Sequence, residues 1–349
     1  MAVVDLMRLT RFAAPVLAAA FCWPLSVAAE TAVHLKLDRK IDGPAAPFFV
    51  AIDRGYFKAE GLDVTIDAAP ATDPQDAIKL LAPGRYDLIV SDLNQLIMLR
   101  DQGAIGAKAV FIVFDKPCAA IIARRSHGVA APADLAGKIL GAPASEPASA
   151  RWPIFAELNG IDTSQITVEN VGLPVRDPML ASGEVDAVTG CAFTSYIDLK
   201  ARGVPKDDLV VWQMADYGVE LYGDAIMASE NFMAEQPDAV RGFLRAYVKA
   251  LQETVRDPVG AIAALLRRSD SANKDLELER LRMAIADNIV TPAVRTAGFG
   301  AIDPARFAMA LDQLALVYRV QSKDKAIGSF DSSFLPPAAE RSVSNTASR

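Results

Sequence analysis

The stretch "GPAAPFFVAIDRGYFKAEGLDVTI", residues 43–66, decides the fold class. Phe49, Ile52 and Tyr56 recur in it at helical spacing. This pattern predicts a helix that begins near Ala46. Two glycines and a strand-like run follow within the same stretch, so one short segment contains a helix, its end and the element after it.

A complete βαβ unit can be assembled around that helix. Gly55 is suited to end the helix, and Tyr56–Glu60 forms one more helical turn that ends at Gly61. The residues at 63–66 then return as a strand, and the alternating run at 33–37 predicts a strand before the helix. A strand, a helical segment and a second strand in about thirty-five residues are typical of a βαβ unit with parallel strands.

Helical and strand patterns keep alternating along the chain, which is typical of an α/β fold with helices covering a mostly parallel sheet. From about Ala133 the alternation starts afresh, and we expect a second lobe there. The expected elements are helices at 76–81 and 94–100 and strands at 86–90, 109–113, 138–140, 167–171, 185–189 and 209–212. A length of 349 residues with 52% hydrophobic content also favours two lobes over one core.

The C-terminal third reads as helix after helix. Three apolar stripes at helical spacing predict these helices, and we interpret the stripes as core. They consist of Val240, Phe243, Leu244, Tyr247, Val248, Leu251 and Val255; of Leu278, Leu281, Ile285 and Ile289; and of Phe307, Leu311, Leu314 and Tyr318. The residues at 337–349 show no pattern, and we expect a loose tail.

The first 29 residues read as a cleavable signal peptide. Arg8 and Arg11 precede an apolar stretch at 12–23, and small residues precede Glu30. Cys22 is not expected to carry a lipid, because Phe21 stands where such a signal needs a small residue. The apolar stretch is shorter than the ~20 residues that span a bilayer. We therefore expect an exported, soluble, periplasmic protein.

The net charge argues against nucleic acid as a partner, and the cysteine content argues against a disulfide framework. Without residues 1–29, 34 basic and 42 acidic residues remain, a net charge of −8, so nucleic acid is not expected as a partner. Cys118 and Cys191 could pair in an oxidising compartment, but two cysteines give no disulfide framework. We expect two buried free thiols.

Two distant segments repeat each other: "LAPGRYDLIVSDLNQL" from Leu81 and "LASGEVDAVTGCAFTS" from Leu180. Each reads as a helix end, a glycine turn, an apolar strand and the start of the next helix. At Ser91 and Gly190 a strand therefore gives way to a helix, whose first N–H groups have no partner within the helix. Ligands of open α/β sheets bind at the carboxyl ends of strands. We expect these two junctions to face each other across a cleft.

Several short motifs follow one another in order from about residue 33 to 335. They are "PFFVA" at 47–51, "GYF" at 55–57, "EGLDV" at 60–64, the run 87–92, "DLAGK" at 134–138, "GEVD" at 183–186 and "PDAV" at 237–240 with Phe243 and Leu244. In this order they resemble the periplasmic solute-binding proteins of ABC importers, in the group that binds nitrate, sulfonates, taurine and pyrimidine precursors of thiamine.

The resemblance implies a type II periplasmic-binding fold, in which two α/β lobes with mixed, mostly parallel sheets close on a ligand at a hinge. We place the two crossing segments near 115–123 and 217–228. Lobe one would then comprise residues 30–116 plus 223–336, and lobe two residues 117–222. Opening and closing would let a membrane permease distinguish the liganded from the empty protein.

The resemblance also implies a set of ligand-binding positions around the cleft. Pyrimidine-binding relatives carry a tryptophan beside the aspartate after the first strand, where this chain has Arg39, and Trp152 is a candidate for the missing aromatic plate. The predicted ligand-binding residues are Asp38, Arg39, Phe48, Ser91, Asp92, Asn94, Asp115, Ser145, Glu146, Ser149, Trp152, Gly190, Cys191, Phe193, Thr194, Tyr217, Glu220 and Tyr222.

The sequence leaves two classes of ligand open: a sulfonate- or taurine-like acid, and a pyrimidine-type thiamine precursor. Arg39 favours an acidic group or a ring face, whereas Glu146 and Glu220 favour a ligand with hydrogen-bond donors. Bare nitrate is not expected, because aromatic residues such as Phe48 would make the cleft too apolar.

Enzymatic function is not expected from the sequence. Fungal pyrimidine synthases share the implied fold, but they use a cysteine-rich iron-binding run where this chain has the single Cys191. His34 and His127 stand in no metal or triad motif, and no phosphate loop is present. We expect a monomer without cofactor or metal that delivers its ligand to an ABC permease of the inner membrane. The alternatives are a pyrimidine-precursor biosynthetic enzyme of the same fold and a protein that presents its ligand to a membrane sensor.

Overall fold

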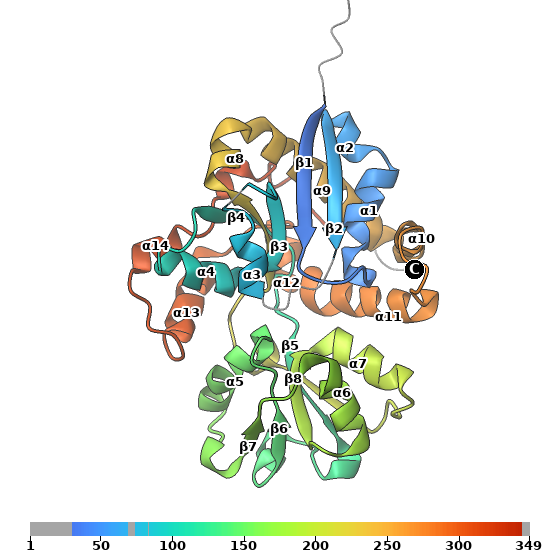
Figure 1. Cartoon of the computed structure of the whole chain (residues 1–349), viewed down its shortest axis with the longest axis vertical. Helices are drawn as coiled ribbons and strands as arrows, with labels where there is room; N and C mark the ends of the chain where they lie inside the picture. Colours follow the sequence, from blue (N-terminus) through green and yellow to red (C-terminus); the bar gives the residue numbers. More distant parts are fainter. Residues whose placement is uncertain (1–29, 69–73, 83, 344–349) are drawn as a thin grey trace, which may run out of the picture.

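The computed structural model describes residues 30–68, 74–82 and 84–343, and it contains two five-stranded sheets, one in each lobe (Figure 1). The strand order in lobe one is β2 (Leu62–Ala68), β1 (Thr31–Leu37), β3 (Leu88–Asp92), β10 (Asp224–Ser229) and β4 (Ala107–Ile112). The strand order in lobe two is β7 (Thr167–Glu169), β6 (Ile139–Gly141), β8 (Ala187–Cys191), β5 (Ala119–Arg124) and β9 (Leu209–Gln213).

Only β10 in the first sheet and β5 in the second run against their neighbours. The remaining neighbour pairs, β1–β2, β1–β3, β6–β7 and β6–β8, are parallel. The predicted α/β class with mixed, mostly parallel sheets is therefore confirmed.

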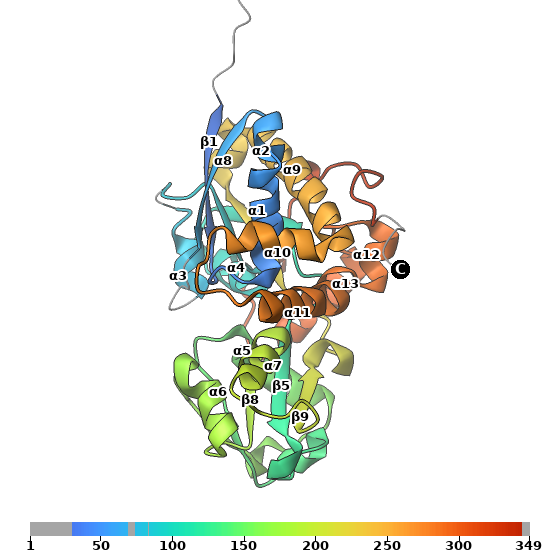
Figure 2. The ribbon, with the colours of Figure 1, turned by 90° about the vertical axis from the view of Figure 1, so that its right-hand side faces the viewer.

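The helices cover both faces of each sheet. Their bounds are α1 (Ala46–Asp53), α2 (Tyr56–Ala59), α3 (Pro74–Lys79), α4 (Leu93–Asp101), α5 (Pro147–Leu158), α6 (Leu173–Ser182), α7 (Ala192–Ala201), α8 (Glu230–Glu235), α9 (Pro237–Arg256), α10 (Pro258–Leu266), α11 (Lys274–Ala284), α12 (Pro292–Ala297), α13 (Pro304–Leu314) and α14 (Lys323–Ile327). Helices α1, α9 and α10 pack together on lobe one, while α5 and α7 belong to lobe two (Figure 2).

The stretch at 43–66 folds as predicted. Helix α1 ends just before Gly55 and helix α2 just before Gly61, and both glycines have positive φ values, 67° and 72°. Side chains rarely adopt this conformation, which is why glycine stops both helices there. Strand β2 then pairs in parallel with β1 along its whole length.

The repeat also takes its predicted form. Strand β3 leads into α4 in lobe one, and β8 leads into α7 in lobe two. Each of these strands is the central strand of its sheet. The two junctions therefore occupy equivalent places in two similarly wound lobes.

Two segments connect the lobes, and the sequence patterns did not predict the strand that each segment enters. The predicted crossing at 115–123 contains most of β5, and the one at 217–228 contains most of β10. Both strands are runs of small or apolar buried residues, in which no polar alternation marks a strand. The connecting residues proper are 113–118 and 218–223.

The C-terminal segment is packed through residue 343. Arg341 is buried and donates to the carbonyl of Pro336 at 2.7 Å, and Gln252 donates to the carbonyls of Glu340 and Ser342. The expected loose tail is therefore wrong for residues 337–343, because a buried arginine and its carbonyl partners fix them. Residues 344–349 lie outside the described residues.

The signal peptide expected at 1–29 also lies outside the described residues. Within residues 30–68, 74–82 and 84–343, none of the helices combines the length and the apolar content that a membrane crossing requires.

Candidate functional site

A cleft of about 380 Å³ lies between the two lobes, where the carboxyl ends of both sheets meet. Its size falls in the range of pockets that hold one small molecule. Lobe one and the crossing segments contribute Asp38, Arg39, Lys40, Asp42, Asp92, Pro117, Cys118, Gly223 and Asp224. Lobe two contributes Ala119, Ser145, Glu146, Pro147, Ala148, Arg151, Leu173, Pro174, Arg176, Asp177, Pro178, Gly190, Cys191, Thr194, Asp198 and Arg202.

The lobe-one wall is built from the loop after β1 and the end of β3. Arg39 forms an ion pair with Asp224, and its guanidinium lies 5.1 Å from the ring centroid of Phe114. Asp92 accepts hydrogen bonds from the backbone N–H groups of Asn94 and Gln95 at 3.0 and 3.1 Å and so caps α4. The Arg39 and Asp92 side chains are therefore already held by protein partners.

The lobe-two wall centres on one buried arginine. Arg176 forms ion pairs with Glu146 and with Asp177, the latter at 2.8 Å, and donates to the hydroxyl of Ser195 at 2.7 Å. A Cβ atom on Gly190 would lie 2.7 Å from the Ser195 Oγ and 3.1 Å from the Arg176 Nη1. Glycine is therefore required at position 190, because the arginine head group and the serine hydroxyl occupy the space of a side chain.

Several ion pairs join the lobes directly, among them Arg280 with Asp198 and Lys200 with Glu279, and one of them is buried at the cleft. Arg151 at the start of α5 pairs with Asp92 at the end of β3, and both residues are buried. The carboxylate that caps a lobe-one helix thus also holds a lobe-two arginine.

The two cysteines form a disulfide bond in this structure, and the expectation of two free thiols is wrong. The bond links the first crossing segment, at Cys118, to the end of β8, at Cys191. The backbone N–H of Ala192 also donates to the Cys118 carbonyl at 2.7 Å. The two residues are 73 positions apart in sequence, so only the antiparallel pairing of β5 with β8 brings them together.

Burial raises the pKa of four acidic residues of the cleft. Burial, together with the nearby Asp224 carboxylate, raises the pKa of Asp38 to about 7. Burial also raises the pKa of Asp42, of Asp224 and of Glu146, against the opposing charge of Arg39 at the first two and of Arg176 at the third. The cleft therefore holds several buried carboxyl groups that a hydrogen-bond donor of a bound ligand would stabilise.

Replacement of Asp38 by asparagine should flatten the dependence of stability on pH. The raised pKa means that folded protein keeps this proton at pH values where the unfolded chain has lost it. Stability from this group is therefore fully present at low pH and is lost as the pH rises from about 4 to about 7. Urea unfolding of wild type and Asp38→Asn across this range measures the difference. The exposed Asp63→Asn is the control, and parallel curves for wild type and Asp38→Asn would contradict the prediction.

The structure brings eight of the predicted ligand-binding residues to the cleft, and their contact with a ligand stays a prediction. These eight are Asp38, Arg39, Asp92, Ser145, Glu146, Gly190, Cys191 and Thr194. Among the described residues, the other ten do not line it.

Six of these ten lie behind the cleft wall. Phe48, Trp152 and Phe193 are buried in the hydrophobic cores, because apolar faces of α1, α5 and α7 pack on the sheets there. Trp152 therefore cannot serve as an aromatic plate in this lobe arrangement. The polar ones are satisfied or enclosed by protein: Ser91 is fully buried in β3, Asn94 donates to the Tyr222 carbonyl at 2.9 Å, and Ser149 hydrogen-bonds Thr189 at 2.7 Å.

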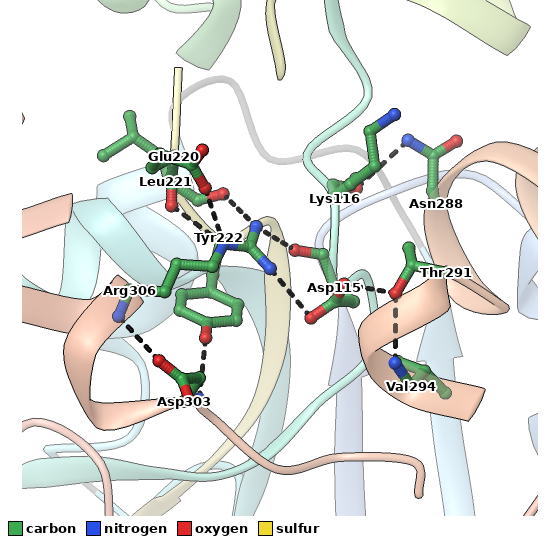
Figure 3. Close-up of polar contacts among 10 residues, drawn as sticks. All are labelled: Asp115, Lys116, Glu220, Leu221, Tyr222, Asn288, Thr291, Val294, Asp303 and Arg306. Atoms are coloured by element: carbon green, nitrogen blue, oxygen red, sulfur yellow. Dashed lines mark hydrogen bonds and ion pairs between the residues drawn. The ribbon is translucent and has the colours of Figure 1, made fainter. Parts of the chain in front are cut away.

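The remaining four belong to the hinge region. Asp115, Glu220 and Tyr222 lie on the two crossing segments and contact Arg306 (Figure 3). Tyr217 packs its ring against Phe155, with 5.5 Å between the ring centroids. The polar groups of Asp115, Glu220 and Tyr222 are turned to the C-terminal segment instead of the cleft.

The sequence patterns missed eight charged residues that line the cleft: Lys40, Asp42, Arg151, Arg176, Asp177, Asp198, Arg202 and Asp224. Arg151 lies in the "ASEPASARWP" segment from which neighbouring residues were chosen, between the chosen Ser149 and Trp152 on helix α5. Asp224 lies in the crossing segment that was singled out. No signal of this kind marked Arg176, because its acidic partner Glu146 is thirty positions away.

Comparison with known proteins shows which family the chain matches. The sequence model of the family described as "NMT1/THI5 like" matches residues 44–261. The chain is 31% identical over 241 residues to a formylaminopyrimidine-binding protein of Halalkalibacterium halodurans, covering 68% of this chain and 71% of the relative. The periplasmic aliphatic sulphonate binding protein SsuA of Escherichia coli has a similar fold, with a TM-score of 0.66, 15% identity and coverage of 82% and 86%.

A further relative corrects one expectation. The chain is 23% identical over 248 residues to a 4-amino-5-hydroxymethyl-2-methylpyrimidine phosphate synthase of Schizosaccharomyces pombe, covering 69% of this chain and 70% of the relative. The expectation that the chain is not an enzyme is contradicted by this kinship, because family members are named as synthases.

Proposed function

The chain belongs to the NMT1/THI5-like family, and on this premise we propose that it captures a small nitrogen-containing ring compound of the pyrimidine type in the interlobe cleft. We propose further that it does so in the periplasm, as the solute-binding component of an import system, and hands the ligand to an ABC permease. The single observation that carries the ligand class is the charge balance of the cleft.

Carboxylates outnumber cations on the cleft wall. Seven acidic residues line it: Asp38, Asp42, Asp92, Glu146, Asp177, Asp198 and Asp224. Five basic residues line it: Arg39, Lys40, Arg151, Arg176 and Arg202. The excess of negative charge favours a ligand that donates hydrogen bonds or carries positive charge over an anion.

Three arginines of the cleft are already held in ion pairs and are not available to an anion. Arg39, Arg151 and Arg176 each form an ion pair with a carboxylate of the same cleft. A sulfonate would have to compete with these carboxylates, and each displaced carboxylate would remain buried without its partner. Sulfonates and nitrate therefore fit this cleft less well than a neutral or cationic ring.

Two acids on the loop after β1, Asp38 and Asp42, can supply acceptors to a ligand. Asp42 is 4% exposed, and within the part of the chain that the structure describes its Oδ1 has no hydrogen-bond partner. The nearest cationic atom of Arg39 is 3.9 Å from Asp38, beyond hydrogen-bond distance. An amino group and a protonated ring nitrogen would satisfy both carboxyl groups.

A thermal-shift screen tests the proposal. At a concentration one hundred times its dissociation constant, a ligand adds about 2.7 kcal/mol to the free energy of unfolding. We expect 4-amino-5-hydroxymethyl-2-methylpyrimidine to raise the melting temperature by roughly 4 °C and taurine and nitrate to leave it unchanged. Asp42→Asn should lose the shift, whereas Asp63→Asn should keep it. A larger shift with taurine or nitrate than with the pyrimidine would overturn the proposed ligand class.

A further inference from the structure

The two segments that connect the lobes lie against each other at the hinge. They consist of residues 113–118 and 218–223. The backbone N–H of Gly223 donates to the Phe114 carbonyl at 3.0 Å, and a Cβ on Gly223 would lie 2.8 Å from the Phe114 Cβ. Any rotation of the lobes must therefore move two tightly packed segments together.

Arg306 on α13 contacts both segments with one guanidinium (Figure 3). Its Nη2 donates to the carbonyl of Asp115 at 2.7 Å on one segment and to the carbonyl of Leu221 at 2.9 Å on the other. Its Nε donates to the Glu220 carbonyl at 3.1 Å. The guanidinium carbon lies 4.1 Å from the ring centroid of Tyr222, which suits a cation–π contact.

Further groups from the C-terminal segment hold this arrangement from the lobe-one side. One oxygen of the Asp115 carboxylate accepts a hydrogen bond from Arg306 at 3.0 Å, and the other accepts one from the Thr291 hydroxyl at 2.5 Å. The backbone N–H of Asp303 donates to the Tyr222 hydroxyl at 2.8 Å. Gln313 on α13 accepts from the Glu220 N–H at 2.8 Å and donates to the Gly218 carbonyl at 2.7 Å.

We infer that Arg306 is a positioning residue that sets the relative orientation of the lobes through the two crossing segments. One planar guanidinium can bind carbonyls of both segments only at one spacing and twist, and those change when the lobes rotate. Arg306 is not among the residues that line the cleft, so it acts on the lobes and not on a ligand. This role holds whatever ligand the cleft takes.

The distance between the lobes in the ligand-free full chain tests the role of Arg306. Nitroxide labels at Lys58→Cys in lobe one and Lys206→Cys in lobe two, both exposed, report that distance by double electron–electron resonance. Arg306→Lys keeps the positive charge but loses the planar fork. We expect it to shift the distance distribution and to raise the population of other lobe arrangements by roughly tenfold, as the loss of one or two hydrogen bonds predicts.

Two further variants make the test specific. Gln313→Ala removes contacts to Gly218 and Glu220 from a half-buried position, should fold, and should shift the distribution in the same direction as Arg306→Lys. Arg245→Lys removes a comparable two-nitrogen contact, to Glu60 on lobe one, and should leave the distribution unchanged. If Arg306→Lys and Gln313→Ala lower the melting temperature but keep the wild-type distance distribution, the residues are merely structural and the inference fails.

Discussion

Replacing both Cys118 and Cys191 with serine should lower the free energy of unfolding by about 4 kcal/mol. The disulfide closes a loop of 73 residues, and a cross-link of that span removes much of the conformational freedom of the unfolded chain. Urea unfolding of the oxidised wild type and of the double variant measures the difference.

The same double variant should also make the wall of the cleft less rigid. The disulfide joins a crossing segment to the strand that leads into α7, and both cysteines line the cleft. Wild type treated with a reductant is the matched control, since it loses the bond but keeps both cysteine side chains, and it should be destabilised by a similar amount. Equal stability of oxidised and reduced wild type would show that the bond does not form in solution.

Local patterns in the sequence were sufficient to predict most of the fold. The helical spacing around Phe49, with Gly55 and Gly61 as stops, predicted the first βαβ unit because helix ends and φ-positive turns are local properties. The repeat near Ser91 and Gly190 predicted two equivalent strand–helix junctions. Strands β5 and β10 were missed, because a strand buried on both faces has no polar alternation.

The candidate site was predicted only where its residues follow a strand end. Asp38, Asp92 and Cys191 were found in this way, since strand ends meet at one edge of a sheet. Arg176 and Arg306 could not be found, because each acts through partners that only the tertiary fold brings close. Polar residues of the crossing segments were placed in the cleft because the sequence does not show which way a side chain turns.

Replacing Arg176 with methionine should destabilise the protein by about 3–5 kcal/mol. The arginine is buried, and its removal leaves Glu146 and Asp177 at the cleft wall without their shared cation. Uncompensated buried carboxylates are costly, and the cost should grow as the pH rises, because burial raises the pKa of Glu146 and deprotonation then charges it. Chemical unfolding at pH 5 and pH 8 measures both effects.

A double variant separates the lost charge pair from lost packing. Arg176→Met with Glu146→Gln removes one carboxylate along with the arginine and should recover a substantial part of the lost stability, because burial already raises the pKa of Glu146 and favours its neutral form. Lys79→Met, which breaks the exposed pair with Asp76, should change stability by less than about 1 kcal/mol. If the double variant is as unstable as Arg176→Met alone, packing of the arginine head group against Gly190 and not the charge balance stabilises this wall, and the electrostatic account of the cleft is wrong.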